Sequence, residues 1–398
     1  MAINDAPALT ERPGRKDDQP AKNQINANDC GNSQTSEYPV DAIVVASFGG
    51  PEGLDDIRPF LENVTRGRGI PPERLDEVGE HYHHFNGISP LNGLNREIIR
   101  HVEEELEKQG RNLPVYFANR NWHPFWNETI EKMVHDGIRH ALVFATSAWA
   151  GYSGCRQYDE DIEKARRHCQ EQGITPPDLT KLRQFYDHPE FIEAEAEAVQ
   201  EALAKIPGDR RENCRIVFTA HSIPVSADKT SGNPGDGDYL YSRQIYEAAH
   251  LTAAKLGLSD DDFDLVWQSR SGPPHIPWLE PDIVDHISTL HDQGIPAAVV
   301  SPIGFVSDHV EVAWDLDTEL AHEAKDFDMA IERAATVGPT QRFTRMIIDL
   351  IDEYIEGRQP LRLGVEPQHG CSLNGVPCFD NCCVPPTKHK HHKHEHRK

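Results

Sequence analysis

Short apolar runs alternate with longer amphipathic segments along most of the chain. The apolar runs are rich in Val, Ile, Ala and Phe and end at Gly, Pro or polar residues, which is typical of buried strands. They predict strands at residues 41–48, 115–118, 141–145, 215–220, 265–268 and 297–301. Helical periodicity predicts helices at residues 54–63, 95–109, 126–136, 159–172, 191–205, 242–256 and 283–293. Strands that alternate with helices in this way predict parallel sheets covered on both faces.

The alternation stops near residues 180–213 and then restarts. We interpret the break as the seam between two similar α/β lobes. The first residues lack an apolar period and are rich in Asn, Asp, Pro, Gln and Ser, a composition that predicts disorder. The predicted organisation is a disordered leader, two lobes, a Cys-rich extension and a disordered His- and Lys-rich tail, at residues 1–38, 39–185, 186–360, 361–387 and 388–398.

A row of acidic residues follows the last predicted strand. Glu311, Asp315 and Glu319 are spaced four apart, which puts their carboxylates on one face of a helix, about 6 Å apart along its axis. Like charges at this spacing destabilise a helix slightly. The row therefore indicates either a solvated surface or a path for cations and protons. His309 and His322 nearby favour the path without deciding it.

Polar loops follow two of the predicted strands. His221 comes directly after the strand at residues 215–220, and Phe48 leads into a Gly-Gly-Pro turn. Ligands of open parallel sheets bind beyond the carboxyl ends of the strands, so we expect both loops and the acidic row at one cleft. A neutral imidazole there accepts a proton or binds a metal ion. A lone histidine at a strand end is more often structural, and the acidic row is what favours a site.

The charge balance excludes one class of partner. The 398 residues carry a formal net charge of −25, which argues against nucleic acid. No apolar stretch is long enough to predict a membrane-spanning helix, and the N-terminus has neither a secretory nor a transit pattern. We therefore expect a cytoplasmic protein, with peripheral membrane contact left open.

Four of the eight cysteines crowd into the last thirty residues. Thiolates at such spacing suit zinc or an iron–sulfur cluster. In a cytoplasmic chain, crowded cysteines indicate metal or cluster binding rather than disulfides. Five histidines beyond them indicate weak metal binding by the tail. The cysteines are Cys30, Cys155, Cys169, Cys214, Cys371, Cys378, Cys382 and Cys383.

Taken together, these segments resemble the ferrochelatases, the enzymes that insert ferrous iron into a porphyrin. The resemblance rests on five motifs that run in family order over residues 40–360: Ser47-Phe-Gly-Gly-Pro-Glu52, Gly87-Ile-Ser-Pro-Leu91, Thr219-Ala-His-Ser-Ile-Pro224, Trp267-Gln-Ser-Arg270 with Trp278-Leu-Glu-Pro281, and Pro302-Ile-Gly-Phe-Val-Ser-Asp-His-Val-Glu311. It implies two Rossmann-like lobes, each with a parallel four-stranded sheet flanked by helices, and a porphyrin in the cleft between them.

The resemblance also implies roles for single residues. His221 and Glu311 would be the paired groups at the iron-insertion centre, and Asp315 and Glu319 would continue the acidic path on a helix that is partly of π type. Substrate contacts would come from six further residues: Phe48, Thr65, Arg66, Ser89, Tyr158 and Trp267. Phe48 stands where some bacterial relatives have a tyrosine, and Thr65 where one has an arginine. An axial phenolate is therefore absent, and the cation is missing at residue 65, although Arg66 and Arg68 adjoin that position.

The Cys-rich end resembles that of the actinobacterial branch, which carries a [2Fe–2S] cluster. The resemblance implies Cys155, Cys371 and Cys378 as ligands, with either Cys382 or Cys383 as the fourth. Branch membership also implies coproporphyrin III rather than protoporphyrin IX as the substrate. We expect the cluster to be structural or sensing, because inserting ferrous iron involves no net redox change.

Two other functions fit the same residues. A cobalt chelatase would share the two-lobed design and the metal-binding histidine, although the aromatic loop around Trp267 and Trp278 favours iron. A non-enzymatic metal or heme carrier would explain the histidine tail and the cysteines. No long apolar seam is evident in the sequence, so we expect a monomer.

Overall fold

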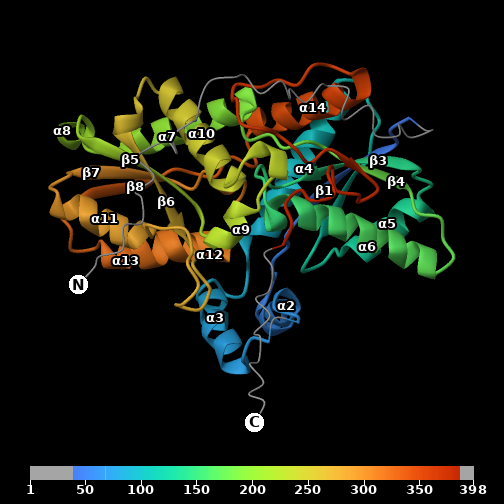
Figure 1. Ribbon diagram of the computed structural model, residues 1–398, viewed down its shortest axis with the longest axis horizontal. Helices are drawn as coiled ribbons and strands as arrows, with labels where there is room; N and C mark the ends of the chain where they lie inside the picture. The colour runs from blue at the N-terminus through green and yellow to red at the C-terminus, as the bar shows by residue number, and fades with distance from the viewer. Residues whose placement is uncertain (1–38, 68, 386–398) are drawn as a thin grey trace, which may run out of the picture.

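A computed structural model describes residues 39–67 and 69–385 of the chain. The predicted leader (residues 1–38) and the His- and Lys-rich tail (residues 388–398) lie outside the described residues. The described chain builds two sheets side by side, each between layers of helices (Figure 1). We refer to the part around the first sheet as the N-terminal lobe and the part around the second as the C-terminal lobe.

The first sheet has the strand order β2-β1-β3-β4-β9 and the second has the order β6-β5-β7-β8. All neighbours run parallel except β9, which pairs antiparallel with β4. The prediction of four strands is confirmed for the second sheet and wrong for the first, because the C-terminal extension adds β9. The strands are β1 (Ala42–Ser47), β2 (Val115–Asn119), β3 (His140–Ala145), β4 (Asp178–Lys181), β9 (Ser372–Leu373), β5 (Cys214–His221), β6 (Phe263–Gln268), β7 (Ala297–Ser301) and β8 (Ala330–Arg333).

The helices connect and cover these strands. The longer ones are α2 (Ile57–Val64), α3 (Pro72–His84), α4 (Pro90–Lys108), α5 (Trp126–His135), α6 (Gln157–Glu171), α7 (Pro189–Lys205), α10 (Leu240–Lys255), α11 (Ile283–Asp292) and α14 (Gln341–Glu356). Short ones are α8 (Gly208–Arg211), α9 (Val225–Lys229), α12 (Val310–Val312) and α13 (Ala321–Glu323). Two π-helices, η2 (Tyr152–Arg156) and η5 (Ala313–Leu320), and three 3-10 turns, η1 (Leu54–Asp56), η3 (Pro234–Asp236) and η4 (Asp260–Asp262), complete the set.

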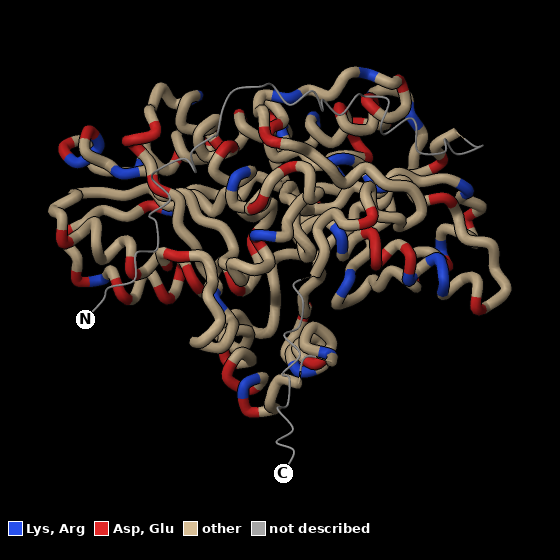
Figure 2. The backbone as a smooth tube through the Cα atoms, in the orientation of Figure 1, with Lys and Arg blue, Asp and Glu red and all other residues tan. Residues whose placement is uncertain are grey.

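One apolar core runs through both lobes. Ile98 of α4, Phe144 of β3, Ile245 of α10 and Phe343 of α14 belong to the same buried cluster. The opposite faces of the two sheets have separate cores, the first under α5 and α6 and the second under α11 and η5. Acidic and basic residues are interspersed along the helices of both lobes (Figure 2). Since the lobes share a core, the carboxyl ends of their strands are held in a fixed relation.

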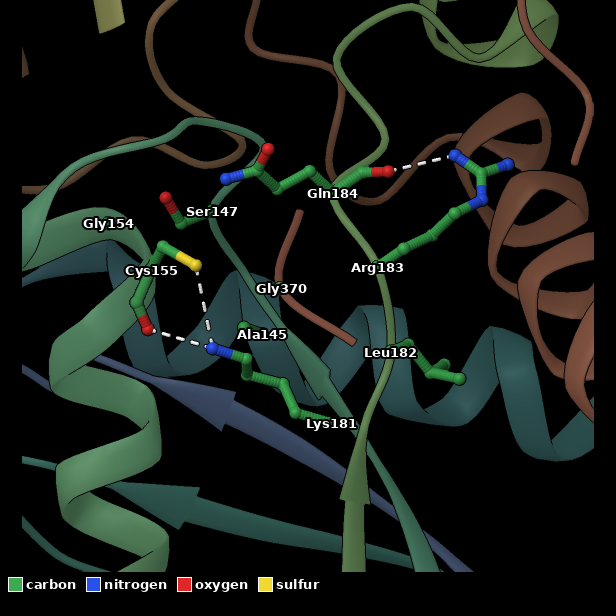
Figure 3. Close-up of a pocket in the computed structure, with 9 residues that line it drawn as sticks. All are labelled: Ala145, Ser147, Gly154, Cys155, Lys181, Leu182, Arg183, Gln184 and Gly370. Carbon is green, nitrogen blue, oxygen red and sulfur yellow. Dashed lines mark hydrogen bonds between the residues drawn. The ribbon is translucent and has the colours of Figure 1, made fainter. Parts of the chain in front are cut away.

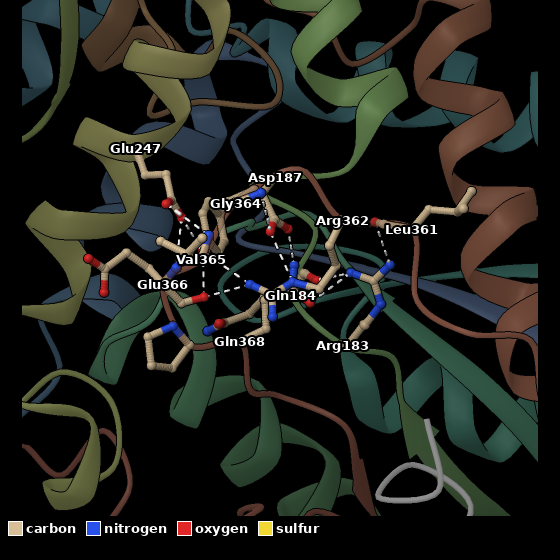
Figure 4. A network of polar contacts seen from close by, with 12 residues as sticks. Arg183, Gln184, Asp187, Glu247, Leu361, Arg362, Gly364, Val365, Glu366 and Gln368 are labelled. Carbon is tan, nitrogen blue, oxygen red and sulfur yellow. Dashed lines mark hydrogen bonds and ion pairs between the residues drawn. The ribbon is translucent and has the colours of Figure 1, made fainter. Parts of the chain in front are cut away.

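A segment after α14, residues 361–370, forms a strap that is tied to the linker between the lobes. The fully buried Asp187 accepts hydrogen bonds from Arg362 Nε at 2.9 Å, from the backbone amide of Gly364 at 3.1 Å and from the Gln368 amide. Glu247 of α10 accepts hydrogen bonds from two further backbone amides of the strap (Figure 4). Because a buried carboxylate must be satisfied by donors, these contacts fix where the Cys-rich extension begins.

Candidate active site

His221 is the last residue of β5, where the sequence predicted it to face a site. Its Nδ1 lies 2.5 Å from the carbonyl oxygen of Ser222, and its own carbonyl accepts a hydrogen bond from the Tyr241 hydroxyl at 2.8 Å. A carbonyl only accepts, so Nδ1 carries the proton and Nε2 keeps a lone pair. The backbone therefore holds the ring with its basic nitrogen turned outward.

Glu311 stands opposite this nitrogen. Its Oε2 lies 3.7 Å from His221 Nε2, and the two side chains are 49% and 34% exposed. The structure thus brings together the two residues that the sequence paired, from β5 and from the three-residue helix α12. An exposed base and an exposed carboxylate at this distance can both reach a substrate that lies between or against them.

His309 organises the start of the helix that carries Glu311. Its Nδ1 accepts a hydrogen bond from the backbone amide of Val312 at 3.2 Å, which caps α12. Burial lowers the pKa of His309, against the opposing charge of Glu311. The ring is therefore neutral at neutral pH, as its role as an acceptor requires.

The acidic row continues from α12 into the π-helix η5, in which backbone hydrogen bonds span one residue more than in an α-helix. Asp315 Oδ2 accepts hydrogen bonds from the Gln268 amide at 3.2 Å and from the Ser269 hydroxyl. Burial raises the pKa of Asp315 to about 7; the Ser269 hydrogen bond opposes this, and the charges of Glu311 and Glu319 add to it. Burial, with Asp282 and Glu323, also raises the pKa of Glu319. The Asp315 carboxyl can therefore exchange protons near neutral pH.

Asp315→Asn is expected to change the pH dependence of the protein. A raised pKa means that the folded protein holds this proton more tightly than the unfolded chain, so the free energy of unfolding of the parent falls as the pH rises from 3.8 to about 7. The variant lacks this loss and should resist urea better than the parent at pH 8, with little difference at pH 4. Its turnover at pH 8 should fall several-fold, because the ionised carboxyl is gone. Urea titrations at pH 4 and 8 and rates at pH 6 and 8 check the two effects, and identical pH slopes in parent and variant would contradict them.

Three of the predicted substrate contacts lie at accessible positions. Phe48 is 40% exposed directly after β1, with its ring 6.4 Å from that of Phe60. Arg66 is exposed after the end of α2. The Thr65 hydroxyl donates to the carbonyl of Leu61 at 2.7 Å, so its hydrogen is used within the protein. Their contacts with substrate stay predictions.

The other three are buried. The hydroxyl of Ser89 caps α4 by accepting from the Leu91 amide at 3.5 Å. Tyr158 lies under Arg120, whose guanidinium is 4.6 Å from the ring centre. Trp267 is 0% exposed and packs against Tyr241, the residue that bonds the His221 carbonyl. The indole thus supports the site from behind, and direct substrate contact by these residues stays a prediction.

Sequence reasoning missed the role of three residues near the row. Gln268 and Ser269 donate hydrogen bonds to Asp315, and the signal was available because β6 ends at Gln268, at the edge of the sheet where β5 ends at His221. Tyr82 of α3 is buried, and burial together with the charge of Glu311 raises its pKa. No strand leads to Tyr82, so no periodicity pointed to it.

Comparison with known proteins identifies the family. A family model described as Ferrochelatase matches residues 40–355. The chain belongs to the ferrochelatase family. It is 58% identical over 352 residues, 88% of this chain and 94% of the relative, to the coproporphyrin III ferrochelatase of Corynebacterium glutamicum (strain R). It is 57% identical over 346 residues, 87% and 97% of the two chains, to that of Nocardia farcinica. As a ferrochelatase, it is a metal chelatase that inserts iron into a porphyrin.

Among solved structures, the chain is similar to SirB from Bacillus subtilis with Fe3+, with a TM-score of 0.48 and 12% identity over 81% of this chain and 99% of that one. Likeness at this level adds no argument of its own. The chelatase fold of this ferrochelatase rests on the family match and on its two parallel sheets.

Four of the predicted cysteine ligands lie together where the two lobes meet. Cys155, Cys382 and Cys383 belong to one buried cluster, and Cys378 packs against it. Cys383 Sγ accepts hydrogen bonds from the backbone amides of Gly151 at 3.1 Å and Gly232 at 3.2 Å, one from each lobe. We call Cys155, Cys378, Cys382 and Cys383 the four-cysteine group. Cys371 is disulfide-bonded in this structure, and its predicted ligand role stays a prediction.

A small polar pocket lies beside Cys155 (Figure 3). Lys181 is buried there, 2.7 Å from Asp159 Oδ2 and 3.5 Å from Cys155 Sγ. Gln184 Nε2 is buried in the same lining and has no hydrogen-bond partner in the described part of the chain. A side chain on Gly370 would come within 3.3 Å of Cys155 Sγ. Space, a positive charge and an unused donor therefore adjoin the thiol.

The described residues hold neither a preformed metal site nor a membrane-spanning helix. Between residues 39 and 385, residue 68 aside, no three His, Cys, Asp or Glu side chains are arranged to hold a metal ion. In that same part of the chain, no helix combines the length and the apolar character that crossing a bilayer requires.

Proposed function

We propose that this ferrochelatase inserts ferrous iron into coproporphyrin III, with His221 and Glu311 at the insertion centre. The observation that carries the proposal is the 3.7 Å approach of His221 Nε2 to Glu311 Oε2 beyond the strand ends. The substrate is supported by the two relatives named above, which are coproporphyrin III ferrochelatases.

Metallation must remove two protons from the porphyrin nitrogens while the ferrous ion sheds its water. The lone pair on His221 Nε2 can accept one such proton or bind the ion, since Nδ1 is already committed to the Ser222 carbonyl. Glu311, 3.7 Å away, can accept the other. Two groups this close titrate as a pair, so protons belong to the pair rather than to either residue.

The acidic row provides a route by which protons leave the insertion centre or the ferrous ion reaches it. Asp315 and Glu319 have raised pKa values, because both are partly buried beside other carboxyls. Asp315 can therefore hold or release a proton at neutral pH, and either carboxyl can attract a cation when it is ionised. Gln268 and Ser269 keep the Asp315 carboxyl pointed into the row.

The test is anaerobic incubation of the purified protein with ferrous iron and, separately, with each porphyrin. We expect the Soret band of coproporphyrin III to convert to that of its iron complex faster than the band of protoporphyrin IX does. Faster conversion with protoporphyrin IX would overturn the substrate assignment. Competition between Fe2+ and Co2+ tests the cobalt alternative. Deleting residues 388–398 tests a carrier, which should lose much of its metal capacity while an enzyme loses little turnover.

We further propose that the [2Fe–2S] cluster implied by resemblance to the actinobacterial branch takes its four ligands from the four-cysteine group and Cys371, with only one of Cys382 and Cys383 among them. The residues fit such a group in several ways: the thiols converge in a buried setting, two backbone amides already donate to Cys383, and Gln184 offers an unused amide beside Cys155. When bound, the cluster would supply a cross-link rather than electrons, since insertion of ferrous iron has no net redox change.

The same contacts favour Cys383 over Cys382 as the fourth ligand. Hydrogen bonds from the Cys155 and Cys382 thiols and from the Gly151 and Gly232 amides lower the pKa of Cys383. Hydrogen bonds with Cys378 and Cys383 raise the pKa of Cys382. A thiolate is the form that binds iron. We also propose that the protein acts in the cytoplasm, as a monomer.

A further inference from the structure

The helix α3 of the N-terminal lobe is in direct contact with the acidic row of the C-terminal lobe. The imidazole of His81 is stacked on the indole of Trp314, with ring centres 4.0 Å apart and planes 7° from parallel. His84, one turn further along α3, meets the same indole edge-on at 5.6 Å and 86°. Figure 1 shows α3 projecting with α2 below the sheets, so this aromatic contact is made away from the shared core.

Residues that contact the N-terminal lobe lie on both sides of Glu311 in the sequence. Trp314 lies between Glu311 and Asp315, at the start of the π-helix. On the other side of Glu311, Val310 is 1% exposed and belongs to the apolar cluster of α2 and α3. The N-terminal lobe therefore packs against the chain both before and after Glu311.

The helix that carries Glu311 needs this support from the N-terminal lobe. Glu311 sits on α12, a helix of three residues, and a π-helix follows at once. Helices this short have little stability of their own, and π-helical turns persist only where the surroundings support them. His81 is suited to such support: burial and Arg74 lower its pKa, against the charge of Glu311, so the stacked ring is neutral.

We propose that His81 is a positioning residue for iron insertion, whose stack on Trp314 holds Glu311 against His221. This rests on the proposed function of that pair. His81 acts through Trp314, because its ring lies flat on the indole, with ring centres 4.0 Å apart. A contact between the lobes thereby completes a site whose two reacting groups both belong to the C-terminal lobe.

The test compares three variants of the full-length protein. His81→Phe keeps a flat ring for the stack, and His81→Ala removes it. His83→Ala changes an exposed neighbour on α3 as the control. We expect His81→Ala to lower kcat about tenfold with KM for the porphyrin changed less than twofold. His81→Phe should retain at least half of the parent kcat, and His83→Ala should match the parent. Tryptophan emission should rise only in His81→Ala, since an imidazole no longer covers the indole.

Several results would overturn the proposal. A parent-like kcat in His81→Ala would show that the stack does not serve insertion. A His81→Phe variant as slow as His81→Ala would assign the effect to the imidazole nitrogens and not to stacking. If His81→Ala fails to fold, Trp314→Phe and Trp314→Ala repeat the comparison from the other side. If the parent itself inserts no iron, the proposed function fails first, and the emission change alone then reports whether the stack exists.

Discussion

His221→Ala should abolish iron insertion while porphyrin binding largely survives. General acid–base groups typically contribute about 10²–10⁴-fold to a rate, so we expect kcat to fall by at least about 100-fold. The physical reason is that His221 Nε2, which keeps its lone pair, lies 3.7 Å from Glu311 Oε2 at the end of β5. Porphyrin binding should change little, since the alanine leaves the surrounding strand bonded as before.

Stopped-flow absorption at the Soret band measures insertion, and fluorescence quenching measures porphyrin binding. His250→Ala serves as the matched control, because His250 is an exposed histidine on α10 that pairs with Asp260 at the surface. It should insert iron at the parent rate. If His221→Ala did so too, the insertion centre would have been assigned wrongly.

Glu311→Gln extends the same experiment. Turnover should also fall strongly, because glutamine accepts no proton at this position, and more strongly than in Asp315→Asn, whose neighbours can relay. If His221 and Glu311 act as a unit, the double variant should be hardly slower than either single one. Losses that multiply in the double variant would mean that the two groups act independently.

The second large effect is expected for Cys383→Ser. In protein reconstituted anaerobically with iron and sulfide, the parent should show the visible absorption of a [2Fe–2S] cluster and the variant should lose it. Cys155→Ser should behave alike. Both variants should also melt several degrees lower than the parent, because binding energy at a metal group is folding energy and Cys383 bonds both lobes through Gly151 and Gly232.

Two controls make this result specific. Cys169→Ser removes a buried thiol on α6, outside the four-cysteine group, and should keep the absorption. Cys382→Ser should keep it as well if Cys383 is the ligand. Bleaching by Cys382→Ser with retention by Cys383→Ser would reverse the choice between them. A parent that takes up no chromophore would remove the cluster from the proposal altogether.

Much of the fold followed from local pattern. The strands at the centre of each sheet are short runs of Val, Ile, Ala and Phe, and β1, β3, β5 and β7 were all predicted within a few residues. The helix α14 has a clear apolar period and was within reach of the same reasoning, although it was not predicted. Buried central strands can be predicted from the sequence because their side chains face apolar layers on both sides.

Three strands were not predicted, because their local sequence lacks the apolar pattern of a buried strand. The strand β4 reads Asp-Leu-Thr-Lys and looks like a loop, yet Lys181 is buried because Asp159 neutralises it. The edge strand β8 is half-exposed and carries charges. The two residues of β9 are a strand only because β4 offers them an open edge. In each case the partner that makes the strand stable is remote in sequence.

The sequence by itself determined the two α/β lobes, the row of three carboxyls, the histidine at a strand end and the crowding of cysteines, since each is a matter of spacing along the chain. Only the tertiary structure decided that His221 Nε2 faces Glu311, that Gln268 and Ser269 turn Asp315 into the row, that Cys383 bonds both lobes and that His81 stacks on Trp314. The reason is that strand order and the packing of distant helices choose these neighbours, and neither leaves a period in the sequence.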